Sequence, residues 1–293
     1  MENKSINIQA YGYLILTFVL WGSLYVVSKY ILGKLPTFTI SFLRFSIAFA
    51  VLTVTRKRSV RPVEKRDFPY LFLLGIGGYF IAVGAQLLGT KYAGASMASL
   101  LNSLNPVTMT LFAALILHEP FTKSKAAGIA LALAGVYVIL GGGGVNSPVG
   151  IGLSLFSVLF WSLVSVLMRR VTQKYDAISV TRYGVGIAAL CYLPVCLWEI
   201  AETGGIHLDA PGILALLYMG VVCTGGAYYL WNKSLSLLDA STCSAFYPVQ
   251  PLVSAGLGML FLGEKTGLGF WIGALLIVAG IFVNLFGNGL LHT

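Results

Sequence analysis

Residues 95–135 read ASMASLLNSLNPVTMTLFAALILHEPFTKSKAAGIALALAG, and residues 240–280 repeat the pattern as ASTCSAFYPVQPLVSAGLGMLFLGEKTGLGFWIGALLIVAG. The matching residues are 145 positions apart (251 − 106 = 145), and they include Pro106 with Pro251, Glu119 with Glu264, Gly128 with Gly273 and Gly135 with Gly280. A looser copy lies upstream, where Trp21 and Lys29 match Trp161 and Arg169 (161 − 21 = 140), and Arg44 matches Arg182 (182 − 44 = 138). A repeat of this length in a hydrophobic chain predicts a membrane transporter made of two related halves.

The composition is that of a membrane protein. Apolar residues make up 57% of the chain and charged residues 10%, against about 45–50% and about 25% in soluble domains. Ten apolar stretches are long enough to cross a hydrocarbon core of about 30 Å. They are residues 10–32, 37–55, 68–90, 94–117, 125–142, 149–168, 177–199, 212–232, 241–262 and 268–290. We therefore predict an all-α polytopic membrane protein with ten transmembrane helices, the first of which is too long for a cleaved signal peptide.

The basic residues predict the orientation. With the amino terminus inside, the cytoplasmic segments carry thirteen Lys and Arg residues and the external segments carry four: Lys29, Lys34, Lys91 and Lys265. Because Lys and Arg are retained on the cytoplasmic side, both termini are expected in the cytoplasm. The protein itself is expected in the inner (cell) membrane. The basic run between Arg56 and Arg66 lacks interleaved aromatic residues. It predicts a contact with anionic lipid, and no nucleic-acid partner is expected.

An odd number of helices in each half predicts that the halves are inverted. Residues 1–146 and 147–293 each contain five predicted helices, so the second half starts on the opposite side of the membrane. We therefore expect two inverted five-helix repeats around a central cavity, related by a pseudo-two-fold axis in the membrane plane. Two inverted halves can pack together in two related ways, one with the cavity open to the inside and one with it open to the outside, and this permits alternating access.

The same residues resemble the EamA-type members of the drug/metabolite transporter superfamily. The resemblance rests on Trp21-Gly22 with Lys29, on Arg44, on Asn105-Pro106, and on Glu119 followed by Gly128 and Gly135, and it covers essentially the whole chain. It implies an exporter of amino acids or other small metabolites, with the fifth and tenth helices at the periphery. In the second half Arg169 replaces Lys, Ser162 replaces Gly22 and Gln250 replaces Asn105, which predicts an asymmetric cavity.

Polar and aromatic residues inside the predicted helices are the candidate cavity wall. Pro106 and Pro251 are expected to kink their helices, because proline removes a backbone hydrogen bond. Broken helices near the midplane commonly bind the substrate in transporters. The predicted wall consists of Trp21, Tyr25, Tyr79, Asn102, Asn105, Trp161, Tyr247 and Gln250. The alternatives are that the amides cap freed carbonyls or join helices, and that the aromatic residues form an interfacial belt.

Charged residues within or near helices are candidate gates, since such a charge needs a partner or a function. The predicted topology places Lys29, Arg44 and Glu264 toward the outside. It places Arg169, Arg182 and Glu119 toward the inside. We expect ion pairs between the halves to close one mouth at a time. The alternative is that each carboxylate only caps a helix.

The positions of the remaining functional groups limit the function. All ten Asp and Glu residues fall at predicted helix ends or in loops, so a carboxylate for proton exchange is not expected at the midplane. We therefore expect a neutral, zwitterionic or weakly anionic solute. A proton-coupled exporter of lipophilic cations is the alternative. A membrane-embedded enzyme is disfavoured because no His, Asp or Glu cluster is expected at one depth.

No cofactor or metal is expected. The four cysteines, Cys191, Cys196, Cys223 and Cys243, have no metal-ligand spacing and are predicted to pack in helices. Small residues along 126–135 form a face suited to close helix packing. This face is expected to pack within the chain, and contact with a second copy in a homodimer is the alternative.

Overall fold

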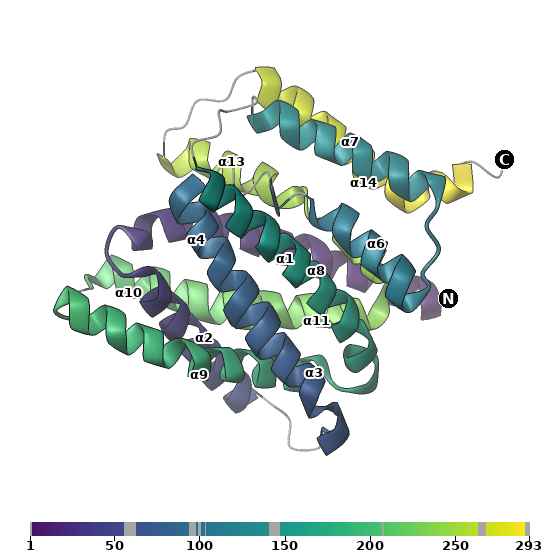
Figure 1. The fold of residues 1–293 in the computed structure, drawn as a ribbon. Helices are drawn as coiled ribbons and strands as arrows, with labels where there is room; N and C mark the ends of the chain where they lie inside the picture. The colour runs from purple at the N-terminus through teal and green to yellow at the C-terminus, as the bar shows by residue number, and fades with distance from the viewer. Residues whose placement is uncertain are drawn as a thin grey trace.

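The computed structural model describes residues 2–55, 63–93, 98, 101–102, 104–140, 147–206, 208–262 and 268–290, and these residues form helices and turns without a strand. Figure 1 shows the helices as one bundle in which α7 and α14 lie together at one side. The helices of the first half are α1 (Glu2–Leu32), α2 (Thr37–Thr55), η1 (Lys65–Asp67), α3 (Phe68–Phe72), η2 (Leu73–Ala82), α4 (Val83–Ala93), α6 (Asn105–Leu117) and α7 (Lys123–Leu140). Those of the second half are α8 (Pro148–Lys174), α9 (Ala177–Thr203), α10 (Ala210–Leu217), η3 (Tyr218–Gly226), α11 (Ala227–Leu237), α12 (Ala240–Ser244), α13 (Val249–Leu262) and α14 (Leu268–Leu290).

These helices form the ten predicted segments. Among the described residues, six segments are long and apolar enough to cross a membrane by themselves: Ile8–Leu32, Thr37–Thr55, Lys65–Tyr92, Pro148–Lys174, Ala177–Thr203 and Ala210–Leu237. The remaining four segments consist of α6, α7, α12 with α13, and α14. Helices α1 and α14 begin and end the described chain on the same side of the bundle (Figure 1). We call that side the N-terminal face, and the side where α1 ends the opposite face.

Contacts between the segments repeat when the two halves are exchanged. Helix α1 packs on α11 and α13, and its counterpart α8 packs on the corresponding helices α4 and α6. The pairs α2 with α9 and α7 with α14 each join equivalent segments of the two halves. The bundle is therefore held together by contacts between its halves, and neither half packs as a separate body.

Glycines join α7 to α14 in a reciprocal way. A methyl group added at Gly135 would lie 2.5 Å from the backbone oxygen of Gly273, and one added at Gly280 would lie 2.6 Å from that of Gly128. The sequence repeat pairs these same four glycines. The glycine face of α7 therefore packs within the chain, as small residues allow in membrane helices.

The third and eighth segments contain wide π-helical turns that the sequence pattern did not reveal. They are η2 and η3, which begin 145 positions apart (218 − 73 = 145). A glycine in each packs tightly on the neighbouring helix of the other half, with Gly75 against Ile187 and Gly220 against Ile47. π turns are rare and often lie next to functional sites.

The two prolines of the repeat begin helices and do not kink them, which corrects the prediction. Pro106 is the second residue of α6, and Pro251 is the third residue of α13. A first-turn residue has no helical acceptor for its N–H, so proline there removes no hydrogen bond. In the second half the break lies earlier, at the turn of residues 245–248 between α12 and α13.

Candidate functional site

A cavity of about 290 Å³ lies between the two halves. Its wall includes residues of α1, α2 and α4 from the first half and of α8, α11 and α13 from the second. Along α1 the wall residues run from Trp21 to Leu32, which is the last residue of that helix. The cavity therefore extends from the middle of the bundle toward the opposite face.

Three side chains of the first half form a polar cluster in the cavity wall. The hydroxyl of Tyr25 accepts hydrogen bonds from the amide of Asn102 at 2.6 Å and from the amide of Gln86 at 3.2 Å. Tyr25 and Asn102 were predicted for this wall, whereas Gln86 was not. Gln86 was not predicted because no sequence motif surrounds it in α4.

The amides that precede the two prolines both lie at the cavity, but they are bonded differently. Asn105 donates to the backbone oxygen of Asn102 at 2.8 Å and accepts from the hydroxyl of Ser162 at 2.9 Å. It thus caps a freed carbonyl and joins the halves while it lines the cavity. The side chain of Gln250 makes no hydrogen bond with the described residues, so its amide is available to a solute.

An aromatic layer closes the inner end of the cavity. Trp21 and Trp161 are in edge-to-face contact with ring centroids 6.0 Å apart, and the indole N–H of Trp161 donates to the Tyr247 hydroxyl. Trp231 lies behind them, 5.7 Å from both Trp21 and Tyr247 by ring centroids. Of the predicted aromatic residues, Tyr79 is the one outside the wall: it is fully buried and accepts a hydrogen bond from Asn232 at 3.1 Å.

The difference between the halves explains why the cavity lies on one side. Gln86 and Asn102 line the cavity, and their counterparts 145 positions later are Trp231 and Tyr247 (231 − 86 = 145; 247 − 102 = 145). When the two halves are exchanged, the side chains of Trp231 and Tyr247 take the places of Gln86 and Asn102, and their rings fill the space that the cavity occupies on the other side. The predicted asymmetry is therefore present, with small polar residues toward the opposite face and large aromatic residues toward the N-terminal face.

A buried ion pair joins the two halves at the N-terminal face. The guanidinium of Arg169, near the end of α8, lies 3.3 Å from the carboxylate of Glu119, whose side chain is 7% exposed. Arg169 also pairs with Asp239 at 2.7 Å and donates to the backbone oxygen of Leu238. His118 ends α6 in the left-handed conformation, with φ of 55°, and turns the chain at Glu119.

Glu119 also caps the first helix of the ninth segment. Its carboxylate accepts hydrogen bonds from the backbone N–H groups of Ala240 and Ser241 at 2.9 and 3.2 Å, and from the Ser241 hydroxyl at 2.7 Å. Lys125 donates to the same hydroxyl at 2.6 Å. Negative charge at a helix N-terminus is favourable. Glu119 therefore both pairs with a cation and caps a helix, and the capped helix belongs to the other half.

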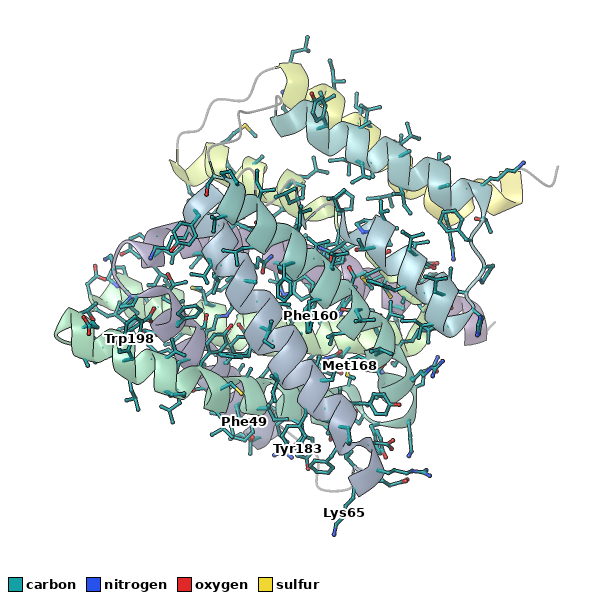
Figure 2. The ribbon with its side chains drawn as sticks, viewed as in Figure 1. Phe49, Lys65, Phe160, Met168, Tyr183 and Trp198 are labelled. Carbon is teal, nitrogen blue, oxygen red and sulfur yellow. The ribbon has the colours of Figure 1, made fainter. Side chains whose placement is uncertain are left out.

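Arg182 does not take part in this cluster. Its guanidinium carbon lies 4.6 Å from the ring centroid of Tyr183 in α9 and 6.0 Å from that of Phe49 in α2; both residues are labelled in Figure 2. The predicted external gate is described only in part. The side chain of Lys29 and the whole of Glu264 lie outside the described residues, and Arg44 lines the cavity.

Arg44 and Arg182 are not equivalent residues, which corrects the sequence pairing. A methyl group added at Gly220 would lie 3.2 Å from the backbone oxygen of Arg44, and one added at Gly75 would lie 3.0 Å from that of Gly184. Gly75 and Gly220 occupy equivalent positions in the two halves, so the residues they contact are equivalent as well. Arg44 is therefore equivalent to Gly184, which lies 140 positions later (184 − 44 = 140). A shift of two residues turns a helix by roughly 200°. The two arginines therefore point in different directions.

An exposed ion pair that the sequence did not predict lies at the opposite face. The ammonium of Lys34 lies 2.5 Å from the carboxylate of Asp209, and that carboxylate also accepts from the N–H of Gly212 at 3.0 Å, capping α10. The hydrogen bond from Lys34 lowers the pKa of Asp209 from its ordinary value. The same hydrogen bond raises the pKa of Lys34.

Replacement of Asp209 by Asn is expected to remove a small pH-dependent stabilisation. Because the pKa of Asp209 is lowered on folding, the stabilisation is present above the ordinary Asp pKa of about 3.9. It is lost as the pH falls through the lowered value. Asn keeps the helix cap. The thermal unfolding midpoint of Asp209→Asn should thus lie slightly below wild type at pH 6–7, and the difference should disappear as the pH falls below the lowered pKa of Asp209; a constant difference would contradict this assignment.

The four cysteines are free thiols, and Cys196, Cys223 and Cys243 are buried. Their positions in helices agree with the predicted packing role. Within the described ranges, no group of three or more His, Cys, Asp or Glu side chains is arranged to hold a metal ion.

A helical bundle with a cavity enclosed between two related halves, closed at one end by aromatic residues and ion pairs, defines the class of polytopic membrane transporters. The profile of the EamA-like transporter family matches residues 8–141 and matches again at residues 148–286. The chain belongs to this family. The resemblance drawn from the sequence is thereby confirmed, and the protein is a transporter and not an enzyme.

Relatives and a solved structure match along nearly the whole chain. An uncharacterized transporter of Archaeoglobus fulgidus is 30% identical over 92% of this chain and 96% of its own. A probable amino-acid metabolite efflux pump of Salmonella typhimurium is 28% identical over 93% of each chain. A crystal structure matches with a TM-score of 0.82 at 25% identity, over 94% of this chain and 98% of that one.

Proposed function

We propose that the protein exports small metabolites such as amino acids across the cell membrane by alternating access between two inverted halves, residues 1–146 and 147–293. Both termini lie in the cytoplasm, so the N-terminal face is the cytoplasmic one. The probable efflux pump among the relatives supports this direction of transport. The cavity of about 290 Å³ is near the lower limit of about 300 Å³ for small-molecule sites, which suits a solute of amino-acid size.

The exchange of contacts between the halves is the observation that carries this proposal. Because α1 and α8 make equivalent contacts in the two halves, the bundle has two related ways to pack, and each opens a different face. In this structure the cavity reaches toward the opposite face, and the aromatic layer and the ion pairs close the N-terminal face. With the termini in the cytoplasm, this arrangement corresponds to the state open to the outside.

The cluster of Glu119, Arg169 and Asp239 is the closed cytoplasmic gate in this mechanism. It connects α8 to the loop after α6 and to the start of α12, so inward opening must separate these groups. The aromatic layer must separate in the same movement. Arg182 is excluded from the gate because its guanidinium lies against Tyr183.

A counterflow experiment tests the function. Purified protein in liposomes loaded with an unlabelled amino acid should accumulate the same radiolabelled amino acid from outside, and lipophilic cationic dyes should not be accumulated. Within the described residues no Asp or Glu lines the cavity, so we expect this flux without an accompanying proton movement. Accumulation of a cationic dye with alkalinisation of the liposome lumen would instead establish a multidrug antiporter.

A double-mutant cycle tests the gate. Glu119→Gln and Arg169→Gln should each weaken the closed state, and the double variant should show a coupling of about 1–3 kcal/mol between the two sites, measured from counterflow rates. The matched control is Glu119→Gln with Arg182→Gln, for which the two effects should add. Additive effects of Glu119→Gln and Arg169→Gln would reject the ion pair as a gate.

A further inference from the structure

The guanidinium of Arg44 is a buried cation with no carboxylate partner among the described residues, and its polar neighbour is the neutral hydroxyl of Tyr228. Arg44 is 3% exposed, and its Nε makes no hydrogen bond within the described part of the chain. No described carboxylate lies within ion-pair distance of it. Its guanidinium carbon lies 5.0 Å from the ring centroid of Phe45. A cation inside a membrane protein that no carboxylate neutralises is costly and usually has a function, and no described residue supplies an anion to this group.

Arg44 faces the substrate cavity. It is the single charged residue among the described residues of the cavity wall. The neighbouring polar groups are neutral: the cluster of Tyr25, Gln86 and Asn102, and the amide of Gln250, which has no partner within the described residues. The electrostatic character of the cavity is therefore set by one positive charge, and this charge favours anionic groups and repels cationic solutes.

We propose that Arg44 binds a carboxylate of the transported solute and that this contact selects carboxylate-bearing metabolites over amides and cations. This inference rests on the proposed transport function and names the class of its substrate. A guanidinium matches a carboxylate with two parallel hydrogen bonds. One arginine balances the single charge of a carboxylate, whereas a doubly charged phosphate would retain an unbalanced charge. The neutral amides and hydroxyl then bind the remaining polar groups of the solute.

The equivalence of positions 140 residues apart supports a binding role for Arg44 and argues against a gate at this position. Arg44 corresponds to Gly184, so the second half has no cation at the equivalent place. A symmetric pair of gates would need one there. The binding charge is thus present once, in the half of the cavity that also holds Gln86 and Asn102.

A binding experiment on the wild-type protein provides the first test. Each of the twenty L-amino acids is compared with its carboxamide and with its deaminated acid at 10 mM, using the thermal unfolding midpoint of the purified protein. Glycerol phosphate is included as a separate arm. We expect every stabilising compound to carry a carboxylate, and each carboxamide to be inactive. Stabilisation by a carboxamide, stronger stabilisation by glycerol phosphate than by any carboxylate, or no stabilisation by any carboxylate would overturn the proposal.

Substitutions at Arg44 provide the second test. Arg44→Gln should weaken the binding of the active carboxylates by about 10–100-fold, and Arg182→Gln should leave it unchanged. Arg44→Met should raise the unfolding midpoint of the empty protein, because it removes an uncompensated buried charge, and should abolish the shift by carboxylates. Unchanged carboxylate affinity in Arg44→Gln would refute the site. Carboxylate binding without any counterflow would support the site and contradict the transport function.

Discussion

Trp231→Ala is expected to destabilise the protein by about 3–5 kcal/mol, the usual cost of truncating a buried aromatic side chain to alanine. Trp231 is 1% exposed and packs against Phe18, Trp21 and Tyr247 in the aromatic layer. The measurement is thermal unfolding in detergent followed by circular dichroism, where the midpoint should fall by roughly 10 °C. The transport consequence is a leak, because the removed ring separates the cavity from the N-terminal face.

The matched control is Trp198→Ala. Trp198 is 63% exposed on α9 and lies at the periphery of the bundle (Figure 2), so its removal creates no internal cavity. Its unfolding midpoint should stay within about 1–2 °C of wild type. Equal losses in the two variants would show that the aromatic layer is no more important for stability than a lipid-facing tryptophan.

Gly135→Val and Gly280→Val are expected to cause the second largest loss, about 1–3 kcal/mol or more for each substitution. At both positions the added carbon would meet a backbone oxygen at 2.5–2.6 Å, and a backbone oxygen cannot change rotamer to make room. Helices α7 and α14 must therefore separate. Because the two contacts are related by the exchange of halves, the two substitutions should have similar effects.

Gly256→Val serves as the control, because a methyl group added at Gly256 in α13 would meet nothing within 4 Å. Thermal unfolding of the three variants makes the comparison, and the Gly256 variant should remain close to wild type. A second measurement is the oligomeric state in detergent. If the α7 glycines served a homodimer and not the contact with α14, Gly135→Val would change the apparent mass without lowering the unfolding midpoint.

Much of the fold could be predicted from the sequence because it depends on local hydrophobicity and on the repeat. The apolar stretches gave the ten segments, and the repeat at 145 positions matched residues that occupy equivalent places, such as Gly135 and Gly280. Seven of the eight predicted wall residues lie at the cavity. The amides among them were recognisable because polar residues within apolar helices are rare.

Other features depended on rotation and neighbours, which a linear pattern does not contain. The pairing of Arg44 with Arg182 was wrong by two residues, a difference that hydrophobicity cannot detect but that reverses the direction of a helical side chain. The prolines were assigned to kinks because the start of a helix within an apolar run is not visible in the sequence. Tyr79 was placed at the wall because burial behind another ring depends on tertiary packing.

The sequence alone determined that the protein is a ten-segment, two-fold repeated membrane transporter, because length, apolarity and repetition are sums over many residues and tolerate local error. Only the tertiary structure decided which charges meet. It paired Glu119 with Arg169 and placed Arg44 in the cavity wall without a carboxylate partner among the described residues. These assignments depend on separations of a few ångströms between helices that are far apart in the chain, and such separations are fixed by packing.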